Sequence, residues 1–414
     1  MGTRAVVVGG GAIGVACAHF LAEEGFGVTL LERGEIGHGC SFANAGLIVP
    51  GDSQALPAPG IVREGMRHLL RRDGAFTIRP RPDPELLRWL LTFRRACGAE
   101  TSRRTTAALT ELSRLSLDLY EDLVRAAEVD FGYRRGPLLH VSMTDGWRDR
   151  TRAFADELGA SGFQARLLER DELLDLEPAL SPEVRGGLEL QDQGSGDCLA
   201  YVRTLADGLA RRGVEVRTGV SVRRVLVRSR RAVGVVVGDT GEEIAADLVV
   251  LAAGAWTPAL TEPLGLRLPI QPATGYSCTV PTWDGAPRLP VMLDEAHVIL
   301  LPLRDRVRVA GTLELAGFRA AADPVRYGAV VRAGRGALRE PPPAEGEPWF
   351  GFRPLMPDDL PAIGPVPGVD GALVAAGHGT LGFTQSPATG KLVAELATGG
   401  PTSLPVEPFR PNRF

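Results

Sequence analysis

Short apolar runs alternate with stretches of helical periodicity along the chain, and the first of them form one unit. Residues 5–8 are small or β-branched, which is typical of a buried strand. A helical pattern covers residues 15–24, and residues 28–31 form a second strand-like run that ends at Glu32. The order strand, helix, strand predicts the start of a parallel sheet that is covered by helices.

A longer helical pattern covers residues 83–129, after a stretch at 51–80 that is rich in Pro, Gly and Arg and is predicted to be irregular. Leucines recur in this pattern at helical spacing, and we expect them to pack in a core: Leu109, Leu112, Leu115, Leu119 and Leu123.

The strand and helix alternation returns in the second half of the chain. A helix is predicted over residues 200–212, with Gly213 at its C-terminal end. A last helix is predicted around residues 387–397. Further strands are predicted over residues 136–142, 187–190, 214–217, 220–227, 232–237, 248–252, 298–301 and 307–311.

Composition narrows the class of protein. The chain has 414 residues, 44% of them hydrophobic and 23% charged, with a net charge of −4, as in globular proteins of two or three domains. No apolar run reaches the ~18 residues of a membrane span, and the charge balance argues against nucleic acid as a partner. The 5 cysteines form no CxxC pair, so we expect free thiols and no metal site. No signal-peptide pattern opens the chain, which favours the cytoplasm or the inner membrane face.

The clearest motif is Gly9-x-Gly11-x-x-Gly14, which follows a predicted strand and opens a predicted helix. Gly9 permits a tight turn, Gly11 lets the backbone approach a pyrophosphate, and Gly14 permits close packing of the helix on the strand. The spacing from Gly9 to Glu32 is close to the ~20 positions expected between the motif and an acid that binds ribose hydroxyls. The motif predicts a dinucleotide, but it does not choose between NAD and FAD.

Three further segments favour FAD. Residues 41–47 offer Ser and Asn donors and a glycine, and residues 253–256 follow a predicted strand with Ala-Gly-Ala-Trp. The loop at 377–382, Gly-His-Gly-Thr-Leu-Gly, precedes a helix. Its small residues let the backbone lie against a flat ring, and the positive end of the helix suits the N1–O2 edge of a flavin.

Arg353 is the candidate for substrate binding. Pro354 fixes the backbone directly after it, and a guanidinium held in this way is a bidentate fork for a carboxylate. The alternative is a structural ion pair with Asp358 or Asp359, and the local spacing does not decide between the two.

Together these segments resemble the FAD-dependent D-amino-acid oxidase superfamily, most closely its bacterial D-amino-acid dehydrogenase branch (small subunit type). The resemblance covers nearly the whole chain and depends on the joint order of its motifs. These are VVVGGGAIG, CSFANAGLIVPG, PAPG at 57–60, LLRWLLTFRRAC, LEPAL, GSGDC, FRPLMPDDLPAIG and GHGTLGFTQSPATG.

The resemblance implies an α/β fold in which a Rossmann-like FAD-binding domain is interleaved with an α+β, mixed-sheet substrate domain. We place the FAD-binding domain at residues 1–50, 195–257 and 350–414, and the substrate domain at 51–194 and 258–349. The cofactor residues implied by the motif and the resemblance are Gly9, Gly11, Ala12, Ile13, Gly14, Glu32, Arg33, Ser41, Asn44, Ala45, Gly46, Leu47, Val222, Ala253, Gly254, Trp256, Gly377, Gly379, Thr380, Leu381 and Gly382.

The activity implied is oxidation of a D-amino acid, or of a cyclic hydroxyproline-type amino acid, by hydride transfer to N5 of a noncovalent FAD. The imino acid is then hydrolysed to a 2-oxo acid and ammonia, or retained if cyclic. Electrons in this branch often pass to a membrane quinone chain, which is compatible with peripheral membrane contact. Arg353 matches the carboxylate-binding arginine of the family. The candidate bases are His378, which could instead be hydrogen-bonded inside its loop, and the weaker His297 and Tyr276.

Two departures sharpen the interpretation. Relatives with covalent flavin carry a histidine where Ala43 stands, and relatives that activate oxygen with a lysine have no counterpart here, since Lys391 is the only lysine. Two alternative functions stay open from the sequence. One is an oxygen-dependent glycine or sarcosine-type amine oxidase, and the other is an FAD-binding electron-relay subunit of a hetero-oligomeric dehydrogenase.

Overall fold

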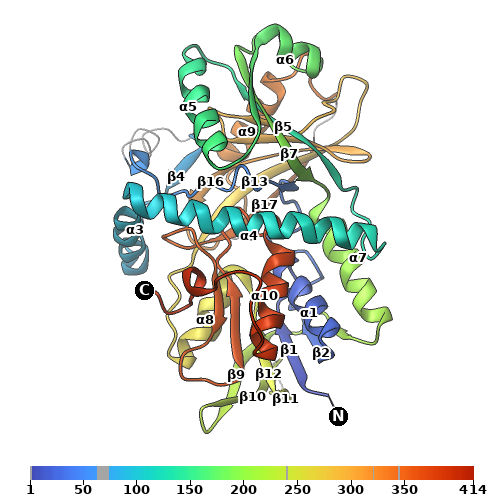
Figure 1. Cartoon of the computed structure of the whole chain (residues 1–414), viewed down its shortest axis with the longest axis vertical. Helices are drawn as coiled ribbons and strands as arrows, with labels where there is room; N and C mark the ends of the chain where they lie inside the picture. Colours follow the sequence, from blue (N-terminus) through green and yellow to red (C-terminus); the bar gives the residue numbers. More distant parts are fainter. Residues whose placement is uncertain (1, 63–73, 239–240, 320, 344–345) are drawn as a thin grey trace.

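The computed structural model describes residues 2–62, 74–238, 241–319, 321–343 and 346–414. Within these residues the strands form a six-stranded sheet, a ten-stranded sheet and a small three-stranded sheet. Figure 1 shows the long helix α4 (Ala99–Arg125) lying across the molecule between the two larger sheets. The predicted α/β class with a second, mixed-sheet unit is confirmed. None of the described helices is both long and apolar enough to cross a membrane.

The six-stranded sheet is built from segments that are far apart in the sequence. Its order is β18-β19-β12-β1-β2-β8, parallel throughout except for the antiparallel pairing of β18 with β19. Helices cover it, so its central strands are buried on both faces and are continuously apolar. The strands are β1 (Arg4–Val8), β2 (Gly27–Leu31), β8 (Glu215–Arg217), β12 (Leu248–Leu251), β18 (Ala362–Pro365) and β19 (Ala372–Ala376).

Three helices belong to this sheet: α1 (Ala12–Glu23), α7 (Cys198–Arg211) and α10 (Ser386–Thr398). Helix α1 packs against both of the others. Its contact with α10 is close, because a Cβ on Gly390 would lie 2.6 Å from the Ala16 backbone. The N-terminal and C-terminal parts of the chain therefore share one core.

The ten-stranded sheet runs β17-β13-β16-β15-β14-β5-β7-β3, with β4 paired to β16 and β6 to β7. It is mixed, because β14 pairs with β5 in parallel while most neighbours are antiparallel. Its strands are β3 (Leu47–Ile48), β4 (Phe76–Ile78), β5 (Arg134–Ser142), β6 (Ala165–Glu169), β7 (Gly186–Ser195), β13 (Gln271–Pro281), β14 (Val291–Leu293), β15 (Val298–Pro302), β16 (Arg306–Leu315) and β17 (Glu347–Leu355).

The structure corrects three sequence expectations. Residues 350–355 lie in β17 of the ten-stranded sheet, so the boundary expected at 350 cuts through a strand of the second unit. The helical pattern over 83–129 is two helices, α3 (Pro84–Ala96) and α4, which are separated at Gly98. The stretch at 51–80 contains β4, while its residues 63–73 lie outside the described part of the chain.

The remaining elements lie around the two sheets. The three-stranded sheet contains β9 (Val222–Arg228), β10 (Arg231–Val237) and β11 (Glu242–Ala245). The other α-helices described are α5 (Trp147–Ala160), α6 (Arg170–Leu176), α8 (Thr257–Thr261) and α9 (Pro324–Gly336).

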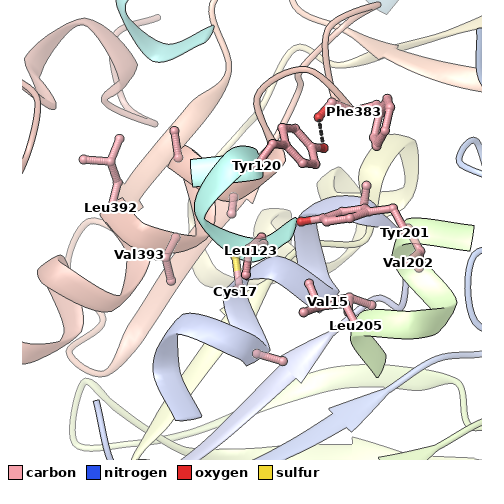
Figure 2. Packing of buried hydrophobic residues seen from close by; sticks show 14 of the residues in the cluster. Val15, Cys17, Tyr120, Leu123, Tyr201, Val202, Leu205, Phe383, Leu392 and Val393 are labelled. Atoms are coloured by element: carbon pink, nitrogen blue, oxygen red, sulfur yellow. Dashed lines mark hydrogen bonds between the residues drawn. The ribbon is translucent and has the colours of Figure 1, made fainter. Parts of the chain in front are cut away.

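The core beneath α4 anchors the glycine-rich loop that precedes α10. Leu109, Leu112 and Leu123 are buried on α4, as the leucine pattern predicts. In Figure 2 the Tyr120 hydroxyl of α4 points at Phe383 and donates a 2.6 Å hydrogen bond to its carbonyl oxygen. The rings of Tyr120, Tyr201 and Phe383 meet edge-on. This buried aromatic cluster holds the end of the 377–382 loop in place.

Candidate functional site

The first turn of the six-stranded sheet has the geometry that its glycines predict. Gly9 has a φ of +117°, and a Cβ there would lie 2.4 Å from the Ala252 carbonyl oxygen. A Cβ on Gly14 would lie 1.8 Å from the Gly9 oxygen. Gly11 is different, because its nearest neighbour would be the Ser41 hydroxyl at 3.4 Å. Packing therefore requires Gly9 and Gly14, whereas Gly11 leaves space in front of the helix.

A cavity of about 450 Å³ lies in front of this turn. It is enclosed by the ends of β1, β2 and β12, the segment around Ser41 and the 377–382 loop. All of the predicted cofactor residues line it except Gly14, Ala45, Gly46, Leu47 and Leu381. Of these, Ala45, Leu47 and Leu381 line an adjoining cavity, while Gly14 and Gly46 are packed against backbone.

The donors and acceptors of this cavity fit the adenosine end of a dinucleotide. Helix α1 begins after Gly11 with no side-chain cap on that residue, which is the usual setting for a phosphate. The Glu32 carboxylate accepts from the backbone N–H groups of Gly10 at 2.7 Å and Gly34 at 2.8 Å, which fixes it at the cavity edge. The Arg33 guanidinium lies over the Trp256 ring at 3.7 Å and closes one wall.

A second cavity, of about 560 Å³, adjoins the first. The two share wall residues at their junction, namely Cys40, Asn44, Arg353 and Thr380. The second cavity reaches from the 377–382 loop to β13, β16 and α3, and its walls are largely apolar. A flat ring at the junction would lie against the small residues of the loop, as a flavin requires.

Arg353 is a half-buried cation without a carboxylate partner at this junction. Its Nη1 donates to the Thr312 carbonyl oxygen at 2.7 Å, and the guanidinium fills the space where Gly275 lacks a side chain. Among the described residues, no carboxylate oxygen lies within 4.0 Å of it. Burial lowers the pKa of Arg353, and the nearby Cys40 thiol opposes that effect.

The alternative of a structural ion pair for Arg353 is wrong. Asp358 instead accepts from Arg413 at 2.7 and 2.9 Å. Asp359 accepts the backbone N–H of Leu56 at 2.8 Å. The N–H groups of Arg353 that do not donate to Thr312 are therefore available to an anion in the cavity.

The three candidate bases lie in different settings. His378 is buried in the loop with its Nε2 2.9 Å from the Thr389 hydroxyl, and burial lowers its pKa to about 3. It faces the first cavity and not the second, which fits the alternative of a histidine held inside the loop. His297 lines the second cavity, is exposed, and sits in the β14–β15 turn with a φ of +47°.

Tyr276 also lines the second cavity, but its hydroxyl is already used. It donates to Glu314 Oε2 at 2.6 Å, and that carboxylate in turn accepts from Arg319. Burial and the neighbouring Glu314 raise the pKa of Tyr276 above its usual range. A phenol bound to a carboxylate in this way is a poor proton acceptor near neutral pH.

Sequence reasoning did not place two acids and one helix at the second cavity. Asp52 and Asp359 line it, and α3 contributes Trp89 and Phe93. Burial raises the pKa of Asp52, while His140 and His297 oppose that shift and Asp294 adds to it. The motifs that contain Asp359, Trp89 and Phe93 do not show that these residues meet, because only the tertiary fold brings the loop after β3, the β17–β18 turn and α3 to one cavity.

One group of possible metal ligands lies outside both cavities. Among the described residues, His19, Glu23 and Glu128 bring their ligand atoms close together. Arg212 already donates to His19 Nδ1 at 2.7 Å and pairs with Glu128 at 3.6 Å. The cationic position of this group is therefore filled by a side chain.

Comparison with known families decides what kind of cofactor site this is. Residues 4–396 match the family described as FAD dependent oxidoreductase, also designated DAO. The chain belongs to this family. The two adjoining cavities of this FAD-dependent oxidoreductase fit the FAD that the family uses, with the glycine turn at one end and the 377–382 loop at the other.

Similar proteins share the full length of this FAD-dependent oxidoreductase. It is 37% identical to a D-amino acid dehydrogenase of Methylobacterium nodulans, with 99% of each chain covered. It is 36% identical to a D-amino acid dehydrogenase of Xanthobacter autotrophicus, covering 96% of this chain and 95% of that one.

Solved structures agree on the fold. Glycine oxidase from Geobacillus kaustophilus superposes with a TM-score of 0.79 at 24% identity, covering 100% of this chain and 99% of the other. L-proline dehydrogenase from P. horikoshii superposes with a TM-score of 0.76 at 22% identity, covering 100% and 98%.

Proposed function

We propose that this FAD-dependent oxidoreductase oxidises the Cα–N bond of a D-amino acid, cyclic hydroxyproline-type amino acids included, to the imino acid. The observation that carries the proposal is Arg353, a half-buried guanidinium with free donors and no carboxylate partner among the described residues. A substrate carboxylate supplies the missing partner. The proteins named D-amino acid dehydrogenase that share its full length support the D configuration.

The chain contributes position and environment. When bound, FAD would supply at N5 the acceptor for the hydride from the substrate Cα. Arg353 fixes the carboxylate, and so it fixes the substrate Cα relative to the cavity junction. The apolar walls from β13, β16 and α3 exclude water and strengthen the ion pair at Arg353. The released imino acid hydrolyses to a 2-oxo acid and ammonia, or persists if it is cyclic.

The proposal includes a noncovalent FAD held by the predicted cofactor residues that line the two cavities. Ala43 is buried in the wall of the second cavity and offers only a methyl group at the position where covalent relatives carry histidine. Acid precipitation of the purified protein tests this point. A yellow supernatant and a colourless pellet are expected, whereas a yellow pellet would overturn the noncovalent assignment.

For the electron acceptor we propose a quinone of the respiratory chain, reached by peripheral contact with the cytoplasmic face of the membrane. Lys391 supports this choice over oxygen, because it lies on α10, pairs with Glu395 at 3.3 Å and lines neither cavity. Turnover with a soluble quinone and with oxygen is compared. Peroxide release as fast as quinone reduction would favour an oxidase instead.

The substrate class is tested by anaerobic flavin bleaching across D-, L-, cyclic and N-methyl amino acids. Bleaching by D-amino acids, and by cyclic ones of matching configuration, is expected. Bleaching by glycine and sarcosine alone would indicate the amine oxidase alternative. A flavin that no amino acid bleaches would indicate the electron-relay subunit.

A further inference from the structure

Asp359 is an acid of the second cavity that has no ion pair among the described residues. It lies in the turn between β17 and β18, six residues after Arg353, and is buried. Its Oδ2 accepts the Leu56 N–H at 2.8 Å. Its Oδ1 lies where a Cβ on Gly379 would come within 2.9 Å, which places it beside the 377–382 loop. It therefore stands at the cavity wall next to the predicted flavin position.

Two features of Asp359 reduce the stability of the folded protein. Its backbone has a φ of +65°, a left-handed conformation that glycine adopts with less strain. Burial raises its pKa to about 7, and the neighbouring Asp358 adds to this while the Leu56 N–H opposes it. Among the described residues, no basic group lies within 4.0 Å of the Asp359 carboxylate, and Arg413 is bound to the adjacent Asp358 instead. A carboxyl group that costs stability in the free protein is typical of a ligand contact.

The other acid of the cavity differs in this respect. Asp52 has His140 and His297 as basic neighbours, and His140 is in turn hydrogen-bonded to Asp294 at 3.0 Å. Asp359 has no such neighbour in the described part of the chain. Among the described residues that line the cavity, Arg353 is a cation without a carboxylate partner, and Asp359 is an acid without a basic partner.

We propose that Asp359 binds a cationic nitrogen of the substrate while Arg353 binds its carboxylate. This inference rests on the proposed function, because it takes an amino acid as the occupant of the cavity. An ionised carboxylate in apolar surroundings gains from a cation that reaches it. The nitrogen is either the α-ammonium group, which passes one proton to the Asp359 carboxylate before the hydride leaves Cα, or an ammonium group at the end of a side chain.

The test uses the FAD-bound full chain and the variant Asp359→Asn. Asparagine keeps the size and tolerates a positive φ, so the turn is retained. The matched control is Asp358→Asn, which removes an adjacent acid that lines neither cavity. D-lysine and D-norleucine serve as substrates, because they differ only in the terminal ammonium group. The measurement is kcat/KM from anaerobic flavin reduction.

A fall of about ten- to hundredfold with both substrates is expected if Asp359 holds the α-ammonium, and with D-lysine alone if it holds a side-chain ammonium. Either result supports the proposal when Asp358→Asn behaves as the wild type. Equal kcat/KM for Asp359→Asn and the wild type with both substrates would overturn it. A wild-type flavin that no D-amino acid reduces would instead refute the proposed function, so the two failures are distinct.

A pH profile gives a second readout. Wild-type kcat/KM should fall as the pH drops through about 7, because protonated Asp359 cannot pair with a cation. Its charged neighbour is Asp358, which is bound to Arg413. The other charged or titratable groups that line its cavity include Asp52, Arg94, His297 and Arg353. Only Asp359→Asn should remove this inflection, and an inflection that survives the substitution would contradict the assignment.

Discussion

Replacing Arg353 by lysine and by alanine separates its charge from its planar fork. The guanidinium has five N–H donors, and one nitrogen already donates to the Thr312 carbonyl oxygen. The remaining donors can form two charge-assisted bonds to a substrate carboxylate, each worth about 1.5–3 kcal/mol. Loss of both in Arg353→Ala costs about 3 kcal/mol or more, which is a fall in kcat/KM of about two orders of magnitude. Arg353→Lys keeps the charge and loses the fork, so a fall of about tenfold is expected.

The assay is anaerobic flavin reduction at increasing concentrations of a D-amino acid and of its carboxamide. The carboxamide lacks the anion, so the alanine variant should process it about as well as the wild type does. Because Arg353 also lines the first cavity, FAD content is measured for each variant. A variant that binds FAD fully and keeps the wild-type preference for the acid over the amide would refute the role of Arg353.

Three further predictions concern stability. Gly14→Ala places a Cβ 1.8 Å from a backbone oxygen, so this variant should lose bound FAD and unfold at a lower temperature. Gly159→Ala is the control, because Gly159 on α5 has open space around it, and it should keep FAD and stability. Equal FAD content in the two variants would contradict the packing role of Gly14. Tyr120→Phe removes the 2.6 Å hydrogen bond to the loop carbonyl, and chemical denaturation should show a loss of about 1–3 kcal/mol, while an unchanged midpoint would contradict the anchoring role. The raised pKa of Asp359, about 7, means that the folded state retains a proton which the unfolded state releases near pH 4. The substrate-free wild type should therefore lose up to about 4 kcal/mol relative to Asp359→Asn as the pH rises from 4 to above 7, and parallel stability curves would contradict this.

The parts of the fold that depend on local pattern could be predicted from the sequence. The turn at Gly9 and the helix after it follow from residues that are neighbours in the chain. The boundary expected at 350 cuts through β17, because the pairing of this strand with β13 is a long-range contact that its own residues do not encode. A pattern of strands does not state which strands pair, so the domain to which a strand belongs is a tertiary property.

The functional site also contains residues that the sequence could single out and residues whose role depends on tertiary contacts. Arg353 could be singled out because Pro354 follows it and because the surrounding motif resembles a known family. The role of His378 could not be settled, because its low pKa depends on complete burial beside Thr389. From the sequence, Asp359 could be named only as a possible partner of Arg353. Its place in the cavity depends on contacts with Leu56 and Gly379, which are not its neighbours in the sequence.

A single anaerobic turnover tests the central claim most directly. The FAD-bound protein is mixed with one equivalent of a D-amino acid that bleaches it, and the flavin, the 2-oxo acid and the ammonia are quantified. The account predicts one equivalent of reduced flavin, one of 2-oxo acid and one of ammonia, and no reaction with the L-enantiomer. Reduction by the L-enantiomer alone, or a flavin that stays oxidised with every amino acid, would contradict it.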